Sequence, residues 1–271
     1  MKVSLVITTY NWKEALDMTL RTVFSQTRLP DEVIVADDGS REDTVAMIRE
    51  KQAKSPIPLI HSWQPDEGFR VAASRNKAIA KARFEYIILT DGDLLLHPQF
   101  CEDHIRNAER GYWLQGTRTN LDRVKTEEIF RTGNTRITCW SRGVERRKNA
   151  IHSPLLGKIF TGNKRSVNGS NLSFWRDDAI AVNGFNEAFV GWGAEDVEFI
   201  ARITHSGIRR RNIRFQALTF HLYHNERSGK MLPHNQALLD QTIQTKATRC
   251  EKGLDAHFAE IADNVNTADV V

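Results

Sequence analysis

Short runs of apolar, β-branched residues alternate with segments of helical periodicity through the first half of the chain. Runs of this length and composition predict buried strands, and the periodic segments between them predict helices. Strands are expected at Val3–Thr9, Glu32–Ala36, Leu59–Trp63 and Tyr86–Thr90, and helices at Trp12–Gln26, Arg41–Lys54 (capped by Ser40) and Val71–Arg83. This alternation predicts an α/β fold with a single mixed, mostly parallel sheet flanked by helices.

The pattern changes in the second half of the chain. The alternation is lost between about Arg118 and Arg165, and this stretch is expected to contain a mobile segment. Order is expected to resume at Asn168–Phe174. Further on, the apolar spacing predicts a helix at Glu195–Ser206, a strand at Phe215–Tyr223 and a helix at Asn235–Lys252.

The composition is that of an ordinary globular protein, with 40% hydrophobic and 27% charged residues in 271. The apolar run Val3–Ile7 is too short for a signal peptide or a membrane span. The three cysteines are widely spaced and odd in number, which argues against a disulfide framework. These features predict a cytoplasmic protein.

Charge is distributed unevenly along the chain. The net charge is +4, but the stretch from Arg118 to Arg165 holds twelve Lys and Arg against four Asp and Glu. This stretch could face an anionic acceptor or a phospholipid surface, which would place the protein peripherally at the inner face of the membrane. A solvated loop explains the charges equally well. The aromatic residues do not interleave with the charges in a known binding pattern, which argues against nucleic acid as a partner.

Three polar clusters stand where predicted parallel strands end. They are Thr8-Thr9-Tyr10-Asn11, Asp37-Asp38-Gly39-Ser40 and Asp91-Gly92-Asp93. Ligands of parallel α/β sheets bind at the carboxyl ends of the strands, so these clusters predict a shared ligand site.

A fourth cluster, Gly191-Trp192-Gly193-Ala194-Glu195-Asp196, combines small residues, an aromatic plate and two carboxylates. A sugar ring can lie on Trp192 while its hydroxyls meet Glu195 and Asp196. Together with the acidic cluster Asp91-Gly92-Asp93, this combination predicts a metal-dependent glycosyltransferase.

The order of the three strand-end clusters resembles that of inverting family-2 glycosyltransferases of the GT-A fold, with a Rossmann-like nucleotide-binding half. Gly68-Phe69-Arg70 and Ala73-Ser74-Arg75-Asn76 strengthen this resemblance. The stretch from Asn183-Gly184-Phe185-Asn186 through Asp196 is similar to the C-terminal region of β-1,4-galactosyltransferases and bacterial chondroitin-polymerase domains. Ala194 departs from the galactosyltransferases, which have a second glycine there, and its methyl group is expected to narrow the acceptor pocket.

The resemblance covers residues 1–110 and 165–225. It implies that three segments of the chain have different functions. Residues 1–110 would bind the nucleotide sugar, residues 111–165 would form a basic connecting segment, and residues 166–271 would form the acceptor-binding and catalytic half.

The resemblance also implies a divalent metal, Mn²⁺ in the first place and Mg²⁺ in the second. Asp93 would bind the metal directly, and Asp91 would contact ribose or a metal-bound water. His221 and His224, three residues apart after a predicted strand, would complete the site. Paired aspartates after a strand also form ordinary turns, and a histidine pair also occurs on surfaces without a metal.

For the nucleotide, the family positions imply that Thr8, Tyr10 and Asp38 hold the uridine. Tyr10 would stack on the base, and Asp38 would accept a hydrogen bond from the uracil N–H. Arg70 and Arg75 could contact the nucleotide or its diphosphate. The alternative for Arg75 is an ion pair with a structural carboxylate.

For the reaction, the resemblance implies that Asp196 is the general base and that Glu195 orients the acceptor hydroxyl, with Trp192 and Gly193 in the acceptor site. The expected activity is transfer of a hexose or N-acetylhexosamine from a UDP-sugar to a glycan or a lipid-linked saccharide. As an alternative role, Glu195 and Asp196 would only begin the following helix. Two other protein classes are alternatives. One is a nucleotide-sugar-binding protein without turnover, and the other is a nucleotidyltransferase, although no Gly-rich phosphate loop is present near the N-terminus.

Overall fold

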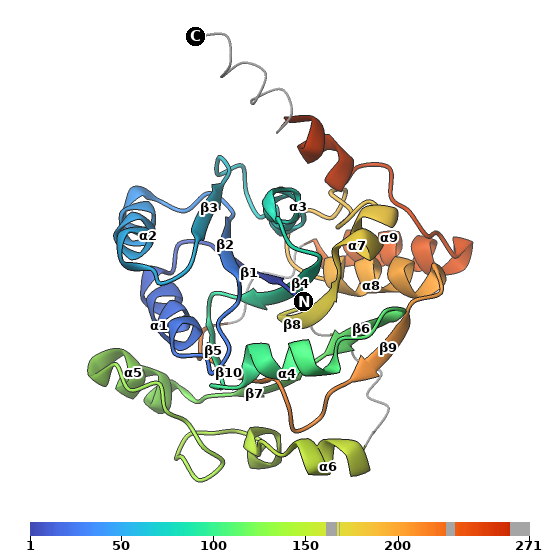
Figure 1. Ribbon diagram of the computed structural model, residues 1–271. Coiled ribbons are helices and arrows are strands. Elements are labelled where there is room, and N and C mark those ends of the chain that lie inside the picture. The colour runs from blue at the N-terminus through green and yellow to red at the C-terminus, as the bar shows by residue number, and fades with distance from the viewer. Residues whose placement is uncertain (161–166, 168, 226–230, 261–271) are drawn as a thin grey trace.

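A large mixed sheet with helices on both faces forms the centre of the computed structural model, which describes residues 1–160, 167, 169–225 and 231–260 (Figure 1). Its strands lie in the order β3 (Leu59–Trp63), β2 (Glu32–Asp37), β1 (Val3–Thr9), β4 (Tyr86–Asp91), β8 (Asn171–Trp175), β6 (Tyr112–Gln115) and β9 (Arg209–Asn212). The first four strands are parallel, β8 is antiparallel to both of its neighbours, and β9 is parallel to β6. The predicted mostly parallel α/β sheet flanked by helices is confirmed.

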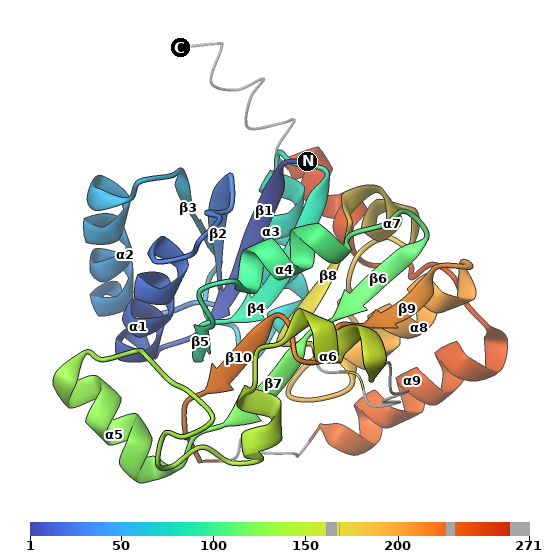
Figure 2. The same ribbon diagram turned by 60° about the horizontal axis from the view of Figure 1, so that its bottom comes forward.

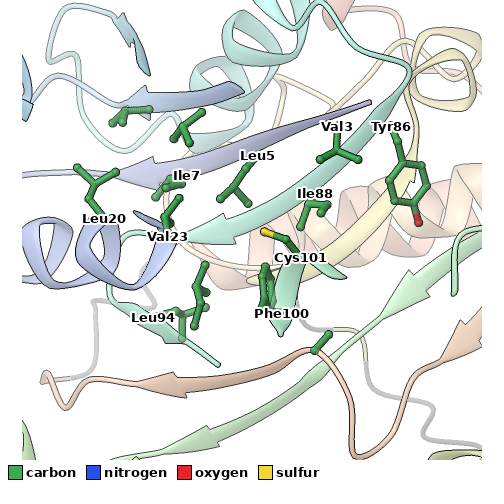
Figure 3. Close-up of a cluster of buried hydrophobic side chains, with 14 of the residues drawn as sticks. Val3, Leu5, Ile7, Leu20, Val23, Tyr86, Ile88, Leu94, Phe100 and Cys101 are labelled. Carbon is green, nitrogen blue, oxygen red and sulfur yellow. The ribbon is translucent and has the colours of Figure 1, made fainter. Parts of the chain in front are cut away.

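Both faces of the sheet are buried, which explains the continuous apolar runs in its central strands β1, β2 and β4. On β1, Val3, Leu5 and Ile7 pack into one core, shown in Figure 3, and Val6 packs into the core of the opposite face. The first face is covered by α1 (Lys13–Phe24), α2 (Glu42–Lys54) and α4 (Phe100–Asn107), and the second by α3 (Val71–Lys81), α7 (Arg176–Ala181) and α8 (Glu195–His205).

The cap predicted for α2 is wrong. The helix begins at Glu42, and Arg41 occupies the N-cap position without a side-chain hydrogen bond. The hydroxyl of Ser40 instead accepts a hydrogen bond from the backbone N–H of Asn11, which has a left-handed φ of 50°. Ser40 therefore ties the loop after β2 to the loop after β1 and does not start the helix.

A second sheet makes the single-sheet prediction incomplete. Its three strands lie in the order β5 (Leu94–Leu96), β10 (Leu218–His221) and β7 (Thr117–Asn120), with β10 antiparallel to β5 and parallel to β7 (Figure 2). β10 is shorter than the strand predicted at Phe215–Tyr223, because Phe215 and Ala217 have positive φ values of 58° and 45°. The strand pairing places the loops after β4 and β10 beside each other.

Regular structure also continues where its loss was predicted. After β7 come α5 (Arg123–Thr132), the 3₁₀ helix η1 (Arg147–Ala150) and α6 (Pro154–Ile159). Asp122 caps α5 by accepting a hydrogen bond from the N–H of Lys125, and Gly133 ends the helix at φ +67°. The last residues of this stretch, 161–165, lie outside the described residues, as do Ser166 and Asn168.

The C-terminal helix differs from its prediction at both ends. α9 spans Leu232–Thr245 and ends at Lys246, whose φ of 51° turns the chain out of the helix before the predicted end. α8 agrees closely with its prediction, and its apolar side packs under the large sheet. Within the described part of the chain, none of the helices has the length and apolarity needed to cross a bilayer.

Candidate active site

A cavity of about 800 Å³ opens at the carboxyl ends of β1, β2 and β4, as the polar clusters predict. Strands from both predicted halves of the chain share the large sheet and bring their loops to this cavity. Of the predicted site residues, Thr8, Tyr10, Asp38, Arg75, Asp91, Asp93, Trp192, Glu195, His221 and His224 line it. Arg70, Gly193 and Asp196 stand beside the lining residues and do not line the cavity themselves.

Asp38 is anchored at the end of β2 with only 2% of its surface exposed. Its carboxylate accepts hydrogen bonds from the backbone N–H of Arg70 (2.8 Å) and from the Gln64 amide (2.6 Å). Burial raises the pKa of Asp38, and these two hydrogen bonds oppose the rise. The guanidinium of Arg70 pairs with Glu67 at 2.7 Å and donates to the Pro65 carbonyl, and Arg70 does not line the cavity. Arg70 therefore contributes its backbone to the site.

Arg75 joins three parts of the site. Its guanidinium donates to Thr8 Oγ1 (3.3 Å), to Asp91 Oδ1 (3.3 Å) and to Glu195 Oε1 (3.0 Å). The residue is 4% exposed, and its guanidinium also lies over the ring of Phe185. A guanidinium carries five N–H donors, and these bonds account for three of them. Arg75 thus forms the ion pairs that were the alternative to nucleotide binding.

Asp93, His221 and His224 converge on one point. Asp93 Oδ2 lies 3.4 Å from His221 Nε2 and 3.5 Å from His224 Nε2, and the two Nε2 atoms are 3.2 Å apart. Three ligands held about 2.1 Å from one cation at angles of about 90–110° would be separated by about 3.0–3.4 Å. The triangle therefore has the dimensions of a metal site.

The second sheet explains how residues from opposite halves of the chain form this triangle. In the β5–β10 ladder His221 pairs with Leu94, and the N–H of Leu222 donates to the carbonyl of Asp93 at 3.0 Å. His224 is oriented by its Nδ1, which lies 2.7 Å from the carbonyl of Asn225. A backbone carbonyl at one ring nitrogen leaves the other for a ligand, as is usual for metal-binding histidines.

The two predicted catalytic carboxylates point in different directions. Glu195 faces the cavity and Arg75. Burial raises the pKa of Glu195, and the Asp196 carboxylate adds to that rise while Arg75 opposes it. Asp196 Oδ2 accepts from the N–H of Gly169 at 2.6 Å, and its Oδ1 accepts from the N–H of Val197 at 2.8 Å. Asp196 is therefore fixed by backbone donors behind the lining residues.

The loop before α8 presents Trp192, which is 48% exposed at the cavity. The fully buried Asn235 of α9 holds this loop by donating to the carbonyls of Val190 and Gly193. Gly193 has φ +110°, and a side chain there would press against α9. Ala194 adopts φ +72°, a conformation in which glycine has less strain. Ala194 does not line the cavity, so the expected narrowing by its methyl group is not seen.

Several residues of the cavity wall were not predicted. β7 contributes Arg118 and Asn120, which lie two positions apart on the same face of the strand, and Glu145 lies beside them with a hydrogen bond to Asn120. Phe69, Trp12 and Tyr223 also line the cavity. The two-residue spacing of Arg118 and Asn120 is the pattern of two side chains on one face of a strand. It points to the cavity only once β7 is known to pair with β10.

Comparisons with known proteins match both halves of the chain. Residues 4–168 match the profile of glycosyl transferase family 2, and residues 160–225 match that of the N-terminal domain of galactosyltransferase. Chondroitin synthase of Escherichia coli is 27% identical over 252 residues, covering 84% of this chain and 35% of that protein. The chain therefore spans about a third of the length of this curated relative.

Two solved structures share the fold at low sequence identity. S. aureus TarS 1–349 in complex with UDP-GlcNAc has a TM-score of 0.62 at 17% identity, covering 96% of this chain and 71% of that one. The mannosyltransferase PcManGT of Pyrobaculum calidifontis, in complex with GDP-Man and Mn²⁺, has a TM-score of 0.58 at 17% identity, covering 93% and 65%. The match to the first profile extends over more than half of the sequence, and the chain belongs to glycosyl transferase family 2.

Proposed function

We propose that the protein is an inverting, metal-dependent transferase that moves a hexose or N-acetylhexosamine from a UDP-sugar to a glycan or lipid-linked saccharide. One observation carries the proposal: the triangle of Asp93, His221 and His224 shares a single cavity with Trp192 and Glu195. A site for a charged leaving group and a site for a sugar therefore lie next to each other.

In this proposal the first part of the chain, residues 1–110, recognises the nucleotide. The Asp38 carboxylate, held by Arg70 and Gln64, accepts a hydrogen bond from the uracil N–H. The ring of Tyr10 stacks on the base, with Thr8 and Asp91 beside the ribose. The complex of TarS with UDP-GlcNAc supports a UDP-sugar as the donor.

The donor set and its spacing fit a divalent cation. Asp93, His221 and His224 would hold it, and a mixed set of imidazole and carboxylate ligands suits Mn²⁺, with Mg²⁺ as the second candidate. The complex of PcManGT with Mn²⁺ supports this assignment. A divalent cation bound there would supply positive charge against the diphosphate.

Asp196 and Glu195 have different roles toward the acceptor hydroxyl. The acceptor hydroxyl attacks the anomeric carbon on the face opposite the nucleotide, and Asp196 takes its proton as the new bond forms. The bond from the anomeric carbon to the diphosphate oxygen breaks, and its electron pair leaves with UDP. Glu195 orients the hydroxyl, and Trp192, at the loop held by Asn235, stacks on the acceptor ring.

The exposed basic residues are assigned to the acceptor side. Arg142, Arg146, Arg147 and Lys148 are all exposed around η1, next to the cavity residue Glu145. We propose that they attract an anionic acceptor or the anionic surface of a membrane that carries a lipid-linked one.

The test is an assay of a panel of UDP-sugars for hydrolysis and transfer, with Mn²⁺, with Mg²⁺ and with a chelator. We expect at least one UDP-sugar to release UDP, and the chelator to abolish that release. Release of pyrophosphate would favour a nucleotidyltransferase. Binding of UDP-sugars without turnover, in the presence of metal and a range of saccharide acceptors, would favour a binding protein.

A further inference from the structure

The cavity contains an arginine for which the proposed function has no role. Among the described residues that line it, Arg75 and Arg118 carry guanidinium groups. The charge of Arg75 is already matched by ion pairs with Asp91 and Glu195. Arg118 differs, because its side-chain hydrogen bond goes to the neutral hydroxyl of Ser170 at 3.3 Å. Its charge is therefore available to an anion in the cavity.

Strand pairing places Arg118 between the metal triangle and the catalytic carboxylates. In the β7–β10 ladder Asn120 pairs with His221, so Arg118 lies two positions further along the same face. Ser170, which Arg118 contacts, follows Gly169, whose N–H binds Asp196. A ligand that extends from the metal triangle to Asp196 would therefore pass Arg118.

Geometry on the nucleotide side points to the same place, because Arg118 and Asp91 line the same cavity. The Arg118 backbone is fixed as well, since its carbonyl accepts from the Asn149 amide at 3.2 Å. The guanidinium is thus held by the fold before any ligand arrives.

Charge balance indicates what Arg118 binds. A donor diphosphate becomes more negative when the glycosidic bond breaks, because the electron pair of that bond stays on its oxygen. The triangle offers one carboxylate against a divalent charge, and the single positive charge of Arg75 already faces the two carboxylates of Asp91 and Glu195. In a partly buried cavity an anion needs a matched cation, and a guanidinium matches phosphate oxygens in both charge and shape.

We propose that Arg118 binds the β-phosphate of a nucleoside diphosphate and stabilises the negative charge that this group gains as it leaves. The inference rests on the proposed function and assigns to Arg118 the contact that the sequence suggested for Arg70 and Arg75. Of the two phosphates, the β-phosphate carries the transferred sugar and therefore lies toward Asp196.

The experiment compares binding of UDP and UMP to the full chain and to Arg118→Gln, with Mn²⁺ and with a chelator. Loss of a charged hydrogen bond should weaken UDP binding by about 10- to 100-fold under both conditions. UMP binding should stay at the wild-type level, because UMP lacks the β-phosphate. Unchanged UMP binding also shows that the variant is folded. Arg118→Lys should recover part of the UDP affinity, since it keeps the charge but not the planar fork.

Arg136→Gln is the matched control, because Arg136 is an exposed arginine of the same basic stretch that does not line the cavity. This control should bind UDP as the wild type does. Equal UDP affinity in Arg118→Gln and wild type would overturn the inference, and a raised acceptor KM in that variant would assign Arg118 to the acceptor. A wild-type protein that fails to bind UDP would instead contradict the proposed function.

Discussion

Arg75 and Glu195 form a buried ion pair, with Nη1 3.0 Å from Oε1, that links α3 to the first residue of α8. The same guanidinium pairs with Asp91 at the end of β4. One side chain therefore connects the end of β4 to the start of α8 across the cavity.

Replacing Arg75 with Met should lower the free energy of unfolding by about 3–5 kcal/mol, because two carboxylates would lose their buried partner. Urea denaturation measures this change. Glu195→Gln is the control: it removes one charge and should cost less, since Asp91 remains to pair with Arg75. A loss below about 1 kcal/mol in Arg75→Met would contradict the role of Arg75 as a structural link.

Asp93→Ala should abolish metal-dependent turnover while leaving the fold intact, because it removes one ligand from the triangle. Charge stabilisation by a metal is worth several kcal/mol, so the rate should fall by roughly 100-fold or more. His224→Ala should mainly raise the metal concentration that half-saturates activity. Metal titration curves for His224→Ala and wild type that superimpose would make the histidine pair structural.

Asp196→Asn should lower kcat by about 10²–10⁴-fold, the usual value of general-base catalysis, with UDP and metal binding unchanged. Asparagine has one side-chain oxygen, so it keeps the hydrogen bond from Gly169 and loses the one from Val197. Glu195→Gln should act mainly on the acceptor KM. Steady-state kinetics on both variants separates the roles. If Asp196→Asn keeps a near wild-type kcat, Asp196 is not the general base, and Glu195, which lines the cavity, becomes the candidate.

Asp38→Asn should weaken UDP binding by about 10- to 100-fold, because a charged acceptor of the uracil N–H is lost. The same change should stabilise the free protein at neutral pH. The raised pKa of Asp38 means that the native state keeps this proton to higher pH than the unfolded chain does. The free energy of unfolding therefore falls as pH rises from about 4 through the native pKa.

Thermal unfolding of Asp38→Asn and wild type between pH 4 and pH 8 measures this effect. The advantage of the variant should be smallest at the acid end and should reach its full size above the native pKa. A constant difference across this range would show that the buried charge of Asp38 is not its source.

Neutralising Arg142, Arg146, Arg147 and Lys148 together with Gln should weaken binding of an anionic acceptor or of anionic vesicles without changing UDP affinity. The attraction should fade with salt, because the Debye length shrinks from about 10 Å at 0.1 M to about 3 Å at 1 M. Sedimentation with vesicles and acceptor titration measure the two possibilities. Unchanged binding in both assays would show that these residues belong to a solvated loop and bind neither the acceptor nor the membrane.

The sequence was sufficient for those parts of the fold that local patterns specify. The apolar strands β1, β2 and β4 and the polar clusters that follow them could be predicted because burial on both faces leaves a continuous apolar run. β7 (Thr-Arg-Thr-Asn) and β9 (Arg-Arg-Arg-Asn) are polar, and only partners distant in the chain make them strands.

The site residues that follow locally specified elements were also predictable. Asp93, His221 and Glu195 stand beside recognisable elements and do line the cavity. The sequence could not show that Arg70 does not line it, because the guanidinium pairs instead with a neighbouring carboxylate, Glu67. Arg118 was missed because its place depends on the β7–β10 pairing.

The insertion of β10 between β5 and β7 has a consequence for how the molecule assembles. The metal triangle is complete only when a strand from near the C-terminus has entered a sheet begun in the first half. Closing so long a loop is slow, so the triangle should be among the last features to form during folding. A divalent cation should then act after the rate-limiting barrier, slowing unfolding while leaving the folding rate nearly unchanged. In the cell, the lifetime of the native protein would thus depend on metal supply even when no sugar is being transferred.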